Sequence, residues 1–313
     1  MQSTIMQSTF MMKQNTNNAS LPVTFEIGIM CHNEAQNIGN LLTSLVNQTS
    51  WKMVKKVIVI SSGSTDGTDT IVKSHTRKNP KIVLIKEKRR LGKAHAVNRF
   101  LAITKEEVVV LMGGDVIPKK TTLEFMIKHF DDKEVGIVGA HPVPLNDRNT
   151  FIGFAAHLLW NLHHQISLTH PKMGEMIAVR RVFKKIPVLS AVDEVNIEAL
   201  IRGQGYKAIY APRAVVYNRG PETLREFISR RRSNYFGHLS TKYEYSYLVS
   251  TLNNARVFYL IIKNLKFRPT YMMFLGGSIL LEIISRILGY VDYRFKRKDH
   301  TIWDIAKTTK KLK

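Results

Sequence analysis

The first half of the chain alternates two hydrophobic patterns. Short runs of Val, Ile and Leu are separated by stretches in which apolar residues recur every three or four positions. The runs predict strands at Thr24–Met30, Val54–Ile60, Lys81–Ile85, Val108–Met112 and Val135–Ala140, and the stretches predict helices at Ala35–Val46, Thr70–Arg77, Lys93–Ile103 and Thr121–Phe130. Because the strands are almost continuously apolar, the pattern favours an α/β domain with a mostly parallel, Rossmann-like sheet and helices on both faces.

The rhythm changes after residue 140. An aromatic-rich helix is predicted first, and one strand, a second helix and two further strands follow it. These elements are Phe151–Leu168, Met176–Val179, Glu194–Gly203, Tyr206–Tyr210 and Ala214–Tyr217. We therefore divide the α/β domain, residues 23–220, into a first half over 23–140 and a second half over 141–220.

The last region, residues 221–313, places long apolar runs among basic residues. Tyr271–Leu281 contains no charged residue, and the apolar run continues beyond it with only Glu282 and Arg286 charged. These two residues are four apart and can pair on one helix face. A membrane-spanning helix needs about 20 apolar residues. Together with Val257–Ile262, the run favours an interfacial hairpin of amphipathic helices, with a soluble helical subdomain and a spanning hairpin as alternatives.

Basic side chains outnumber acidic ones throughout the chain. The 313 residues include 47 Lys and Arg against 24 Asp and Glu, a formal net charge of +23. Such a charge attracts nucleic acid, an anionic membrane or phosphorylated substrates. The last 93 residues carry 18 Lys and Arg against 7 Asp and Glu, and their interleaving with apolar runs favours lipid headgroups. Since the pattern of a nucleic-acid-binding module is missing from the sequence, we expect no nucleic acid partner.

The cysteine content and the first 22 residues indicate the cellular compartment of the protein. The single cysteine, Cys31, cannot form an internal disulfide and suits a reducing compartment. Residues 1–22 are polar, repeat the sequence Met-Gln-Ser-Thr and contain no apolar core of signal-peptide length. We expect them to form a flexible tail.

Four polar segments follow predicted strands, at the sheet edge where α/β proteins bind nucleotides. They are Cys31-His32-Asn33-Glu34, Ser61-Ser62-Gly63-Ser64-Thr65-Asp66-Gly67-Thr68, Gly92-Lys93-Ala94-His95-Ala96-Val97-Asn98 and Gly113-Gly114-Asp115-Val116. Taken in this order, they resemble the donor-binding half of a family 2 glycosyltransferase with the GT-A fold, in particular its membrane-associated members.

The resemblance covers roughly Thr24 to His238 and assigns donor contacts to these segments. It implies that a nucleotide-sugar donor is bound by Asn33, Glu34, Ser62, Asp66, Lys93, Gly114 and Asp115. Two serines stand where the family carries aspartates, so a preference for uridine is less secure. Local roles remain open as well: Glu34 and Asp66 can cap the helices that follow them, and Lys93 can belong to a solvated basic turn.

The metal motif departs from the family. Its Asp-x-Asp chelates Mg²⁺ or Mn²⁺, whereas this chain has Gly113-Gly114-Asp115 and keeps only the second carboxylate. One protein carboxylate suffices when diphosphate oxygens and waters complete the coordination shell. The resemblance therefore implies metal-assisted activity with Asp115 as the metal ligand and weak metal affinity without the donor. A histidine often joins the family's site, and here Asn218 lies near the expected position.

An acidic pair, Asp193-Glu194, precedes a predicted helix and Gly205-Tyr206. The family places its catalytic base eleven residues before the Gly of such a pair, which points to Glu194, with Asp193 as the second choice. An inverting transfer needs a carboxylate that accepts the proton of the acceptor hydroxyl. The alternative is that both acids only stabilise the dipole of the helix.

Three consecutive arginines, Arg230, Arg231 and Arg232, resemble a region of the family's membrane-linked members. They are candidates for binding the diphosphate or a lipid-phosphate acceptor, and the alternative is a basic face against lipid. The family's tryptophan for a polymer acceptor is missing from this part of the sequence, which argues against long processive synthesis. We interpret His157, His163 and His164 as packing or acceptor-pocket residues.

These features lead to one functional hypothesis. The protein is expected to be an inverting glycosyltransferase that uses a UDP- or GDP-sugar, with Mg²⁺ or Mn²⁺, at the cytoplasmic face of the cell membrane as a peripheral or monotopic protein. The acceptor is a sugar or a lipid-linked group that offers a hydroxyl or a phosphate. Because acids of the family motifs are missing, a catalytically degenerate protein that only binds nucleotide sugars is the alternative.

Overall fold

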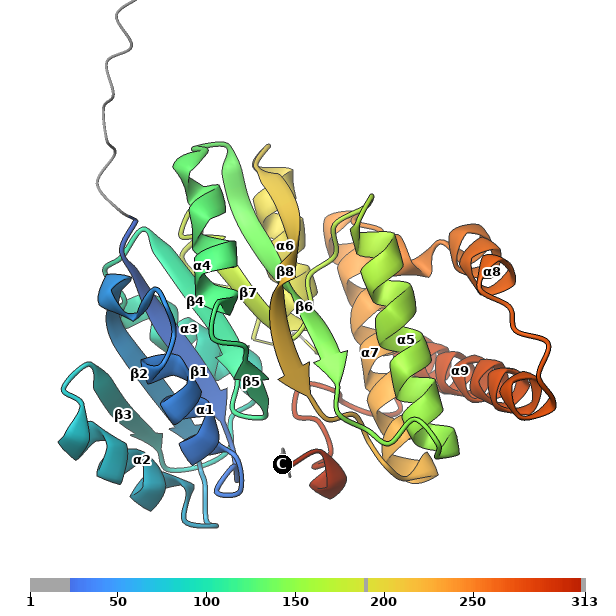
Figure 1. The fold of residues 1–313 in the computed structure, drawn as a ribbon, viewed down its shortest axis with the longest axis horizontal. Coiled ribbons are helices and arrows are strands. Elements are labelled where there is room, and N and C mark those ends of the chain that lie inside the picture. The colour runs from blue at the N-terminus through green and yellow to red at the C-terminus, as the bar shows by residue number, and fades with distance from the viewer. Residues whose placement is uncertain (1–22, 189–190, 311–313) are drawn as a thin grey trace, which may run out of the picture.

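A mixed sheet forms the centre of the molecule in the computed structural model, which describes residues 23–188 and 191–310 (Figure 1). The predicted N-terminal tail lies outside these residues. The strands are β1 (Phe25–Cys31), β2 (Val54–Ser62), β3 (Ile82–Glu87), β4 (Val108–Gly113), β5 (Val116–Pro118), β6 (Val135–Pro144), β7 (Met176–Arg180) and β8 (Lys207–Asn218). Their order in the sheet is β3-β2-β1-β4-β7-β6-β8-β5. The first four strands are parallel, β7 runs antiparallel to β4 and β6, and β5 runs antiparallel to β8.

Helices cover both faces of the sheet, as the alternating pattern predicted. One apolar core joins the sheet to α1 (Ile38–Val46), α2 (Thr68–Lys78) and α4 (Thr122–Ile127), and the other joins it to α3 (Lys93–Ile103) and α6 (Asp193–Gly203). Successive strand residues point to opposite faces, so Ile29 belongs to the first core and Met30 to the second.

Several predicted boundaries were wrong, and the strand expected over Val135–Ala140 continues to Pro144. The strands expected at Tyr206–Tyr210 and Ala214–Tyr217 are one strand, β8, whose register against β6 shifts between Gly139 and His141. The shift is a bulge that accommodates Pro212, which cannot donate a ladder hydrogen bond. The helix expected over Thr121–Phe130 ends at Ile127, and a 3₁₀ turn, η2 (Lys128–Asp131), completes it.

A helical layer stands beside the sheet (Figure 1). It consists of α5 (Phe151–Ser167), α7 (Leu224–Tyr245), α8 (Asn254–Lys263) and α9 (Pro269–Phe295). One face of α9 is buried, and its residues recur every three or four positions: Leu275, Ser278, Leu281, Ser285, Gly289 and Asp292. At Gly289 a Cβ atom would lie 2.7 Å from the carbonyl oxygen of Arg232, so α7 and α9 approach each other closely there. The predicted pair Glu282–Arg286 is confirmed, with a nitrogen–oxygen distance of 2.8 Å.

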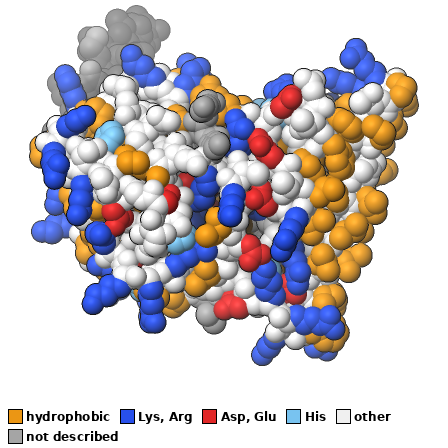
Figure 2. Space-filling view, turned by 90° about the horizontal axis from the view of Figure 1, so that it is seen from below, with side chains coloured by type: hydrophobic (Ala, Val, Ile, Leu, Met, Phe, Trp, Pro, Cys, Tyr) orange, Lys and Arg blue, Asp and Glu red, His pale blue; other side chains and the backbone are white. Residues whose placement is uncertain are grey.

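The opposite side of α8 and α9 exposes large apolar side chains to solvent. We call this surface the apolar face; it comprises Phe258, Tyr259, Ile262, Phe267, Met272, Met273, Ile279, Leu280, Ile283, Ile284, Ile287, Tyr290 and Phe295. Figure 2 shows these side chains as a broad orange area with basic side chains at its ends. Within the described residues, α9 is the one helix long and apolar enough to cross a membrane, judged by length and composition.

After α9 the chain turns back toward the sheet. Residues 298–310, which we call the C-terminal strap, end in the 3₁₀ turn η4 (Lys307–Lys310). In Figure 1 this red segment lies below the carboxyl end of β8. The strap is tied to the first half of the chain, because the Arg90 guanidinium donates to the carbonyl oxygen of Trp303 over 2.8 Å.

Candidate active site

A cavity of about 370 Å³ lies between the carboxyl ends of the first strands, the helical layer and the C-terminal strap. Most of the residues singled out from the sequence line it: Glu34, Ser62, Lys93, Gly114, Asp115, Asp193, Glu194, Arg230 and Arg231. Asn218 lines it as well, whereas Asn33, Asp66, Arg232 and the three histidines of the predicted helix Phe151–Leu168 are not among its lining residues. Segments that are distant in the sequence therefore meet in one place, as the sheet topology requires.

Glu34 reaches the cavity from the loop after β1. Its side chain is buried, one carboxylate oxygen forms an ion pair with Lys310 of the strap, and the Lys310 ammonium also donates to the carbonyl oxygen of His32 over 3.1 Å. Burial and the nearby Asp115 carboxylate raise the pKa of Glu34 to about 8. The carbonyl oxygen of Glu34 accepts the first hydrogen bond of α1. The carboxylate does not accept this bond, and the side chain lines the cavity.

Asn33 and Asp66 brace the loops after β1 and β2. The Asn33 side-chain oxygen accepts from the amide of Thr65 over 2.8 Å, and the Asp66 carboxylate accepts from the amides of Ala35 and Thr68 over 3.0 and 3.1 Å. One of these bonds reaches the first amide of α2, but the N-cap position of that helix is occupied by Gly67. The two residues set the shape of the loops that carry the lining residues.

Ser62 stands where the family carries an acid. Its hydroxyl donates to the Glu87 carboxylate over 2.6 Å and accepts from the amide of Leu91 over 3.3 Å. A carboxylate is therefore close by, one strand further along the sheet, and the serine links β3 to the loop that leads to Lys93.

The turn that carries Asp115 is held by a residue that the sequence analysis missed. The Asn37 amide donates to the carbonyl oxygens of Gly114 and Val116 over 2.7 and 3.4 Å. In the sequence, a polar residue before an amphipathic helix looks like an ordinary helix cap. Gly114 is needed for space, because a Cβ atom there would lie 2.7 Å from Cγ of Glu34.

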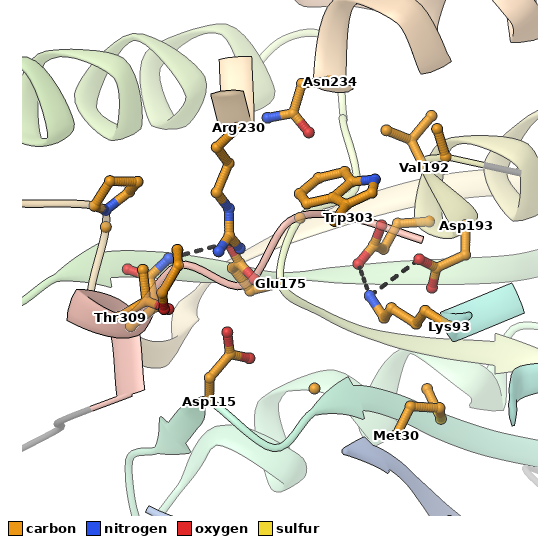
Figure 3. A pocket seen from close by; sticks show the side chains of 18 of the residues that line it. Met30, Lys93, Asp115, Glu175, Val192, Asp193, Arg230, Asn234, Trp303 and Thr309 are labelled. Carbon is orange, nitrogen blue, oxygen red and sulfur yellow. Dashed lines mark hydrogen bonds and ion pairs between the residues drawn. The ribbon is translucent and has the colours of Figure 1, made fainter. Parts of the chain in front are cut away.

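Lys93 joins the predicted donor segment to the acidic pair (Figure 3). Its ammonium lies 3.0 Å from the Asp193 carboxylate and 2.5 Å from the Glu194 carboxylate. Burial and the Glu194 charge raise the pKa of Asp193. Burial also opposes ionisation of Glu194, but the Lys93 charge and hydrogen bond outweigh it and lower the pKa of Glu194. The contact with Lys93 thus favours the ionised form of Glu194.

The three arginines have different environments, because consecutive residues of a helix point about 100° apart. Arg230 points into the cavity, 3.8 Å from the Glu175 carboxylate and 5.4 Å from the centre of the Trp303 ring (Figure 3). Arg231 makes two hydrogen bonds of 2.8 Å to Glu282, and Arg232 pairs with Asp292. The last two therefore anchor α9 to α7.

Several lining residues received no role in the site from the sequence. Glu175 lies just before β7, and its carboxylate accepts from the Asn218 amide over 3.1 Å. Lys172, on the same loop, donates to the carbonyl oxygen of Met173 over 3.2 Å. Trp303 and Lys310 come from the strap. Their roles depend on contacts between distant segments.

The histidines of α5 do not form a metal site. His157 contacts the carbonyl oxygen of Asn146 over 2.9 Å, His164 contacts the Tyr210 hydroxyl over 2.8 Å, and His163 is buried. These contacts fit the packing interpretation. In the part of the chain that the structure describes, no group of three or more His, Cys, Asp or Glu side chains is arranged to hold a metal ion.

Sequence and structure comparisons relate this site to known proteins. The model of glycosyl transferase family 2 matches residues 26–190. Glycosyltransferase AglE of Haloferax volcanii is 27% identical over 168 residues, which are 54% of this chain and 52% of AglE. The chain thus matches about half the length of this curated relative.

Two solved structures share the fold. The mannosyltransferase PcManGT from Pyrobaculum calidifontis, in complex with GDP-Man and Mn²⁺, superposes with a TM-score of 0.65 and 20% identity over 89% of each chain. GalNAc-T7 with UDP, GalNAc and Mn²⁺ superposes with a TM-score of 0.50 and 14% identity over 62% of this chain and 43% of that chain. The expected GT-A fold is confirmed.

Proposed function

The chain belongs to glycosyl transferase family 2, and we propose that it is an inverting enzyme which transfers a sugar from a UDP- or GDP-sugar to a hydroxyl or lipid phosphate. One observation carries this proposal: a single cavity joins the donor segments Glu34, Ser62 and Asp115 to the acidic pair at the start of α6. A donor held by the first group presents its sugar to the second. Lys93, between the two groups, is placed to bind the donor diphosphate.

Glu194 is the proposed general base. It accepts the proton of the acceptor hydroxyl while the acceptor oxygen bonds to the anomeric carbon from the face opposite the diphosphate. The bond from that carbon to the diphosphate oxygen breaks, and its electron pair leaves with the nucleoside diphosphate. Because Lys93 contacts Glu194, a donor diphosphate that attracts the Lys93 ammonium frees Glu194 for the proton. A lipid-phosphate acceptor is already anionic and gives up no proton.

A divalent cation, Mg²⁺ or Mn²⁺, would neutralise the charge of the departing diphosphate when bound. The residues around Asp115 fit such an ion, because the cavity offers carboxylate oxygens there and the Asn218 side-chain oxygen is buried without a hydrogen-bond partner among the described residues. The complex of PcManGT with GDP-Man and Mn²⁺ supports this part of the proposal.

The apolar face favours attachment to a membrane. The free energy falls when lipid covers exposed apolar side chains. The basic residues at the ends of this face can pair with anionic headgroups; they are Lys263, Lys266, Arg268, Arg294, Lys296 and Arg297. We place the protein at the cytoplasmic face as a peripheral or monotopic protein. A lipid-linked acceptor would then be close to the cavity.

A comparison of Glu194→Gln with the wild type tests the catalytic assignment. Purified protein is incubated with Mn²⁺ and a panel of UDP- and GDP-sugars; release of nucleoside diphosphate measures turnover, and the shift in thermal unfolding measures donor binding. We expect turnover to fall about 100-fold or more while the thermal shift persists. The exposed carboxylate Glu134, changed to Gln, serves as the control. Turnover within a few-fold of wild type would exclude Glu194 as the base, and a panel that neither binds nor turns over would overturn the proposed function.

A further inference from the structure

The first acid of the metal motif is missing at Gly113, and the sheet brings another acid to the same position. β4 and β7 pair antiparallel, with Leu111 opposite Ile177 and Met112 opposite Met176. Continued by one residue, this register places Glu175 opposite Gly113. Directly opposite residues of an antiparallel pair project to the same face of the sheet. Extended in this way, the register puts Glu175, the residue just before β7, on the side on which the side chain of residue 113 would lie.

That side is also where Asp115 lies. A Cβ atom built on Gly113 would be 2.5 Å from a carboxylate oxygen of Asp115, so the space left by the missing side chain borders Asp115 directly. Both acids line the cavity, and Figure 3 shows the Asp115 carboxylate directed toward Glu175. Asp115 follows β4 and Glu175 precedes β7, and both line the same cavity.

Asn218 completes the arrangement. It pairs with Val116 in the ladder between β5 and β8, so the sheet holds it one residue from Asp115. Its amide donates to Glu175 over 3.1 Å, which fixes the position of that carboxylate. Asn218 is 5% exposed, and its side-chain oxygen has no hydrogen-bond partner within the described residues. A buried oxygen of this kind costs free energy unless a ligand satisfies it.

We propose that Glu175 supplies the second carboxylate of the cation site that Asp115 begins, with the Asn218 side-chain oxygen as a third, neutral ligand. The inference rests on the proposed function, because the cation would be the one that accompanies the donor diphosphate. Three oxygen ligands suit Mg²⁺ or Mn²⁺, which keep several waters or phosphate oxygens in their shells. Arg230, 3.8 Å from Glu175, stays close enough to contact the diphosphate.

Mn²⁺ binding, measured without turnover, tests this assignment. The signal of free Mn²⁺ in electron paramagnetic resonance is titrated with protein in the presence of UDP or GDP, for the wild type and for Glu175→Gln. We expect the Kd for Mn²⁺ to rise about tenfold or more in Glu175→Gln, because a charged ligand is lost. Glu134→Gln, an exposed acid outside the cavity, is expected to bind like the wild type. Equal affinities of Glu175→Gln and the wild type would overturn the proposal.

A gain of binding gives a second, independent measurement. Asn218→Asp replaces the neutral oxygen with a charged one, so we expect the Kd for Mn²⁺ to fall about threefold or more in the presence of nucleotide. A purely structural role for Asn218 predicts weaker binding instead, because the hydrogen bond to Glu175 is lost; that result would remove Asn218 from the site. Thermal unfolding in EDTA checks that each variant is folded. A wild-type protein that binds neither nucleotide nor Mn²⁺ would contradict the proposed function itself, whereas wild-type binding with unchanged variants contradicts only this inference.

Discussion

The donor half (β1–β4 with α1–α3) and the C-terminal region (α7–α9 with the strap) are built in different ways. The donor half buries its strands under helices on both faces, and short loops at the strand ends hold its site. The C-terminal region joins α9 to α7 through carboxylates paired with Arg231 and Arg232, and it leaves the apolar face uncovered. The structure of a region that completes its own core can be predicted from its hydrophobic pattern. The structure of a region held by paired charges cannot, because its ion pairs depend on where other segments of the chain lie.

The largest effect is expected where the two regions of the cavity meet. Lys93→Met removes the cation that contacts Asp193 and Glu194 and is placed to bind the diphosphate, so turnover of the preferred nucleotide sugar should fall about 100-fold or more. Lys105→Met, at an exposed position after α3, is the matched control. Wild-type turnover in Lys93→Met would show that the donor half works without a cation at this position.

The next effect concerns the anchoring of α9. Arg231→Ala leaves the largely buried Glu282 carboxylate with Arg286 as its remaining ion-pair partner among the described residues, and we expect the free energy of unfolding to fall by about 2–3 kcal/mol in urea titrations. Arg225→Ala, exposed on the same helix, should change stability by less than about 0.5 kcal/mol. Equal effects of the two variants would mean that paired charges do not hold the C-terminal region.

The two regions are expected to respond to pH in opposite directions. Burial and Asp115 raise the pKa of Glu34 to about 8, so its contribution to stability is complete below its ordinary pKa of 4.5 and is lost as the pH rises through about 8. Burial, with the charges of Lys172 and Arg231, lowers the pKa of His238 on α7 well below 6.5. The contribution of His238 is therefore present above pH 6.5 and lost as the pH falls.

Hydrogen exchange, followed by peptide between about pH 5 and pH 8 and corrected for intrinsic rates, checks this contrast. Protection of the loop around Glu34 should decrease toward pH 8, and protection of α7 should decrease toward pH 5. Glu34→Gln should abolish the first trend and keep the second. Parallel trends in both regions would contradict the expectation.

A smaller effect is expected on the apolar face. Ile283→Asp combined with Ile287→Asp places two charges on exposed positions of α9, so binding to vesicles that contain anionic lipid should weaken about tenfold while thermal unfolding stays near that of the wild type. Ile103→Asp, an exposed isoleucine of the donor half, is the matched control. Unchanged vesicle binding in the double variant would assign the membrane contact to another surface.

The smallest effect is expected at the strap. Lys310→Ala removes the ammonium that pairs with Glu34, and we expect the KM for the donor to rise a few-fold because the strap is held less firmly over the cavity. Lys307→Ala, exposed on the same turn, should leave the KM unchanged. Identical KM values for both variants would show that the strap does not act on the donor site.

Much of the donor half followed from local patterns. The predicted helix Lys93–Ile103 has the observed bounds, and the predicted strands of this half end within two residues of the observed ones. Glu282 and Arg286 could be paired in advance because a helix fixes the spacing of residues four apart. The three arginines could not be assigned, because their roles depend on which way each side chain points from α7.

The sequence by itself determined the alternation of strands and helices, the family resemblance and the polar segments at the strand ends, since each rests on residues close together in the chain. Tertiary structure alone decided that Glu175 and Asp115 line one cavity, that Lys93 contacts Glu194 and that Lys310 contacts Glu34. The last pair is separated by 276 positions. Contacts of this kind arise from strand register and helix packing, and they cannot be predicted from local hydrophobic periodicity.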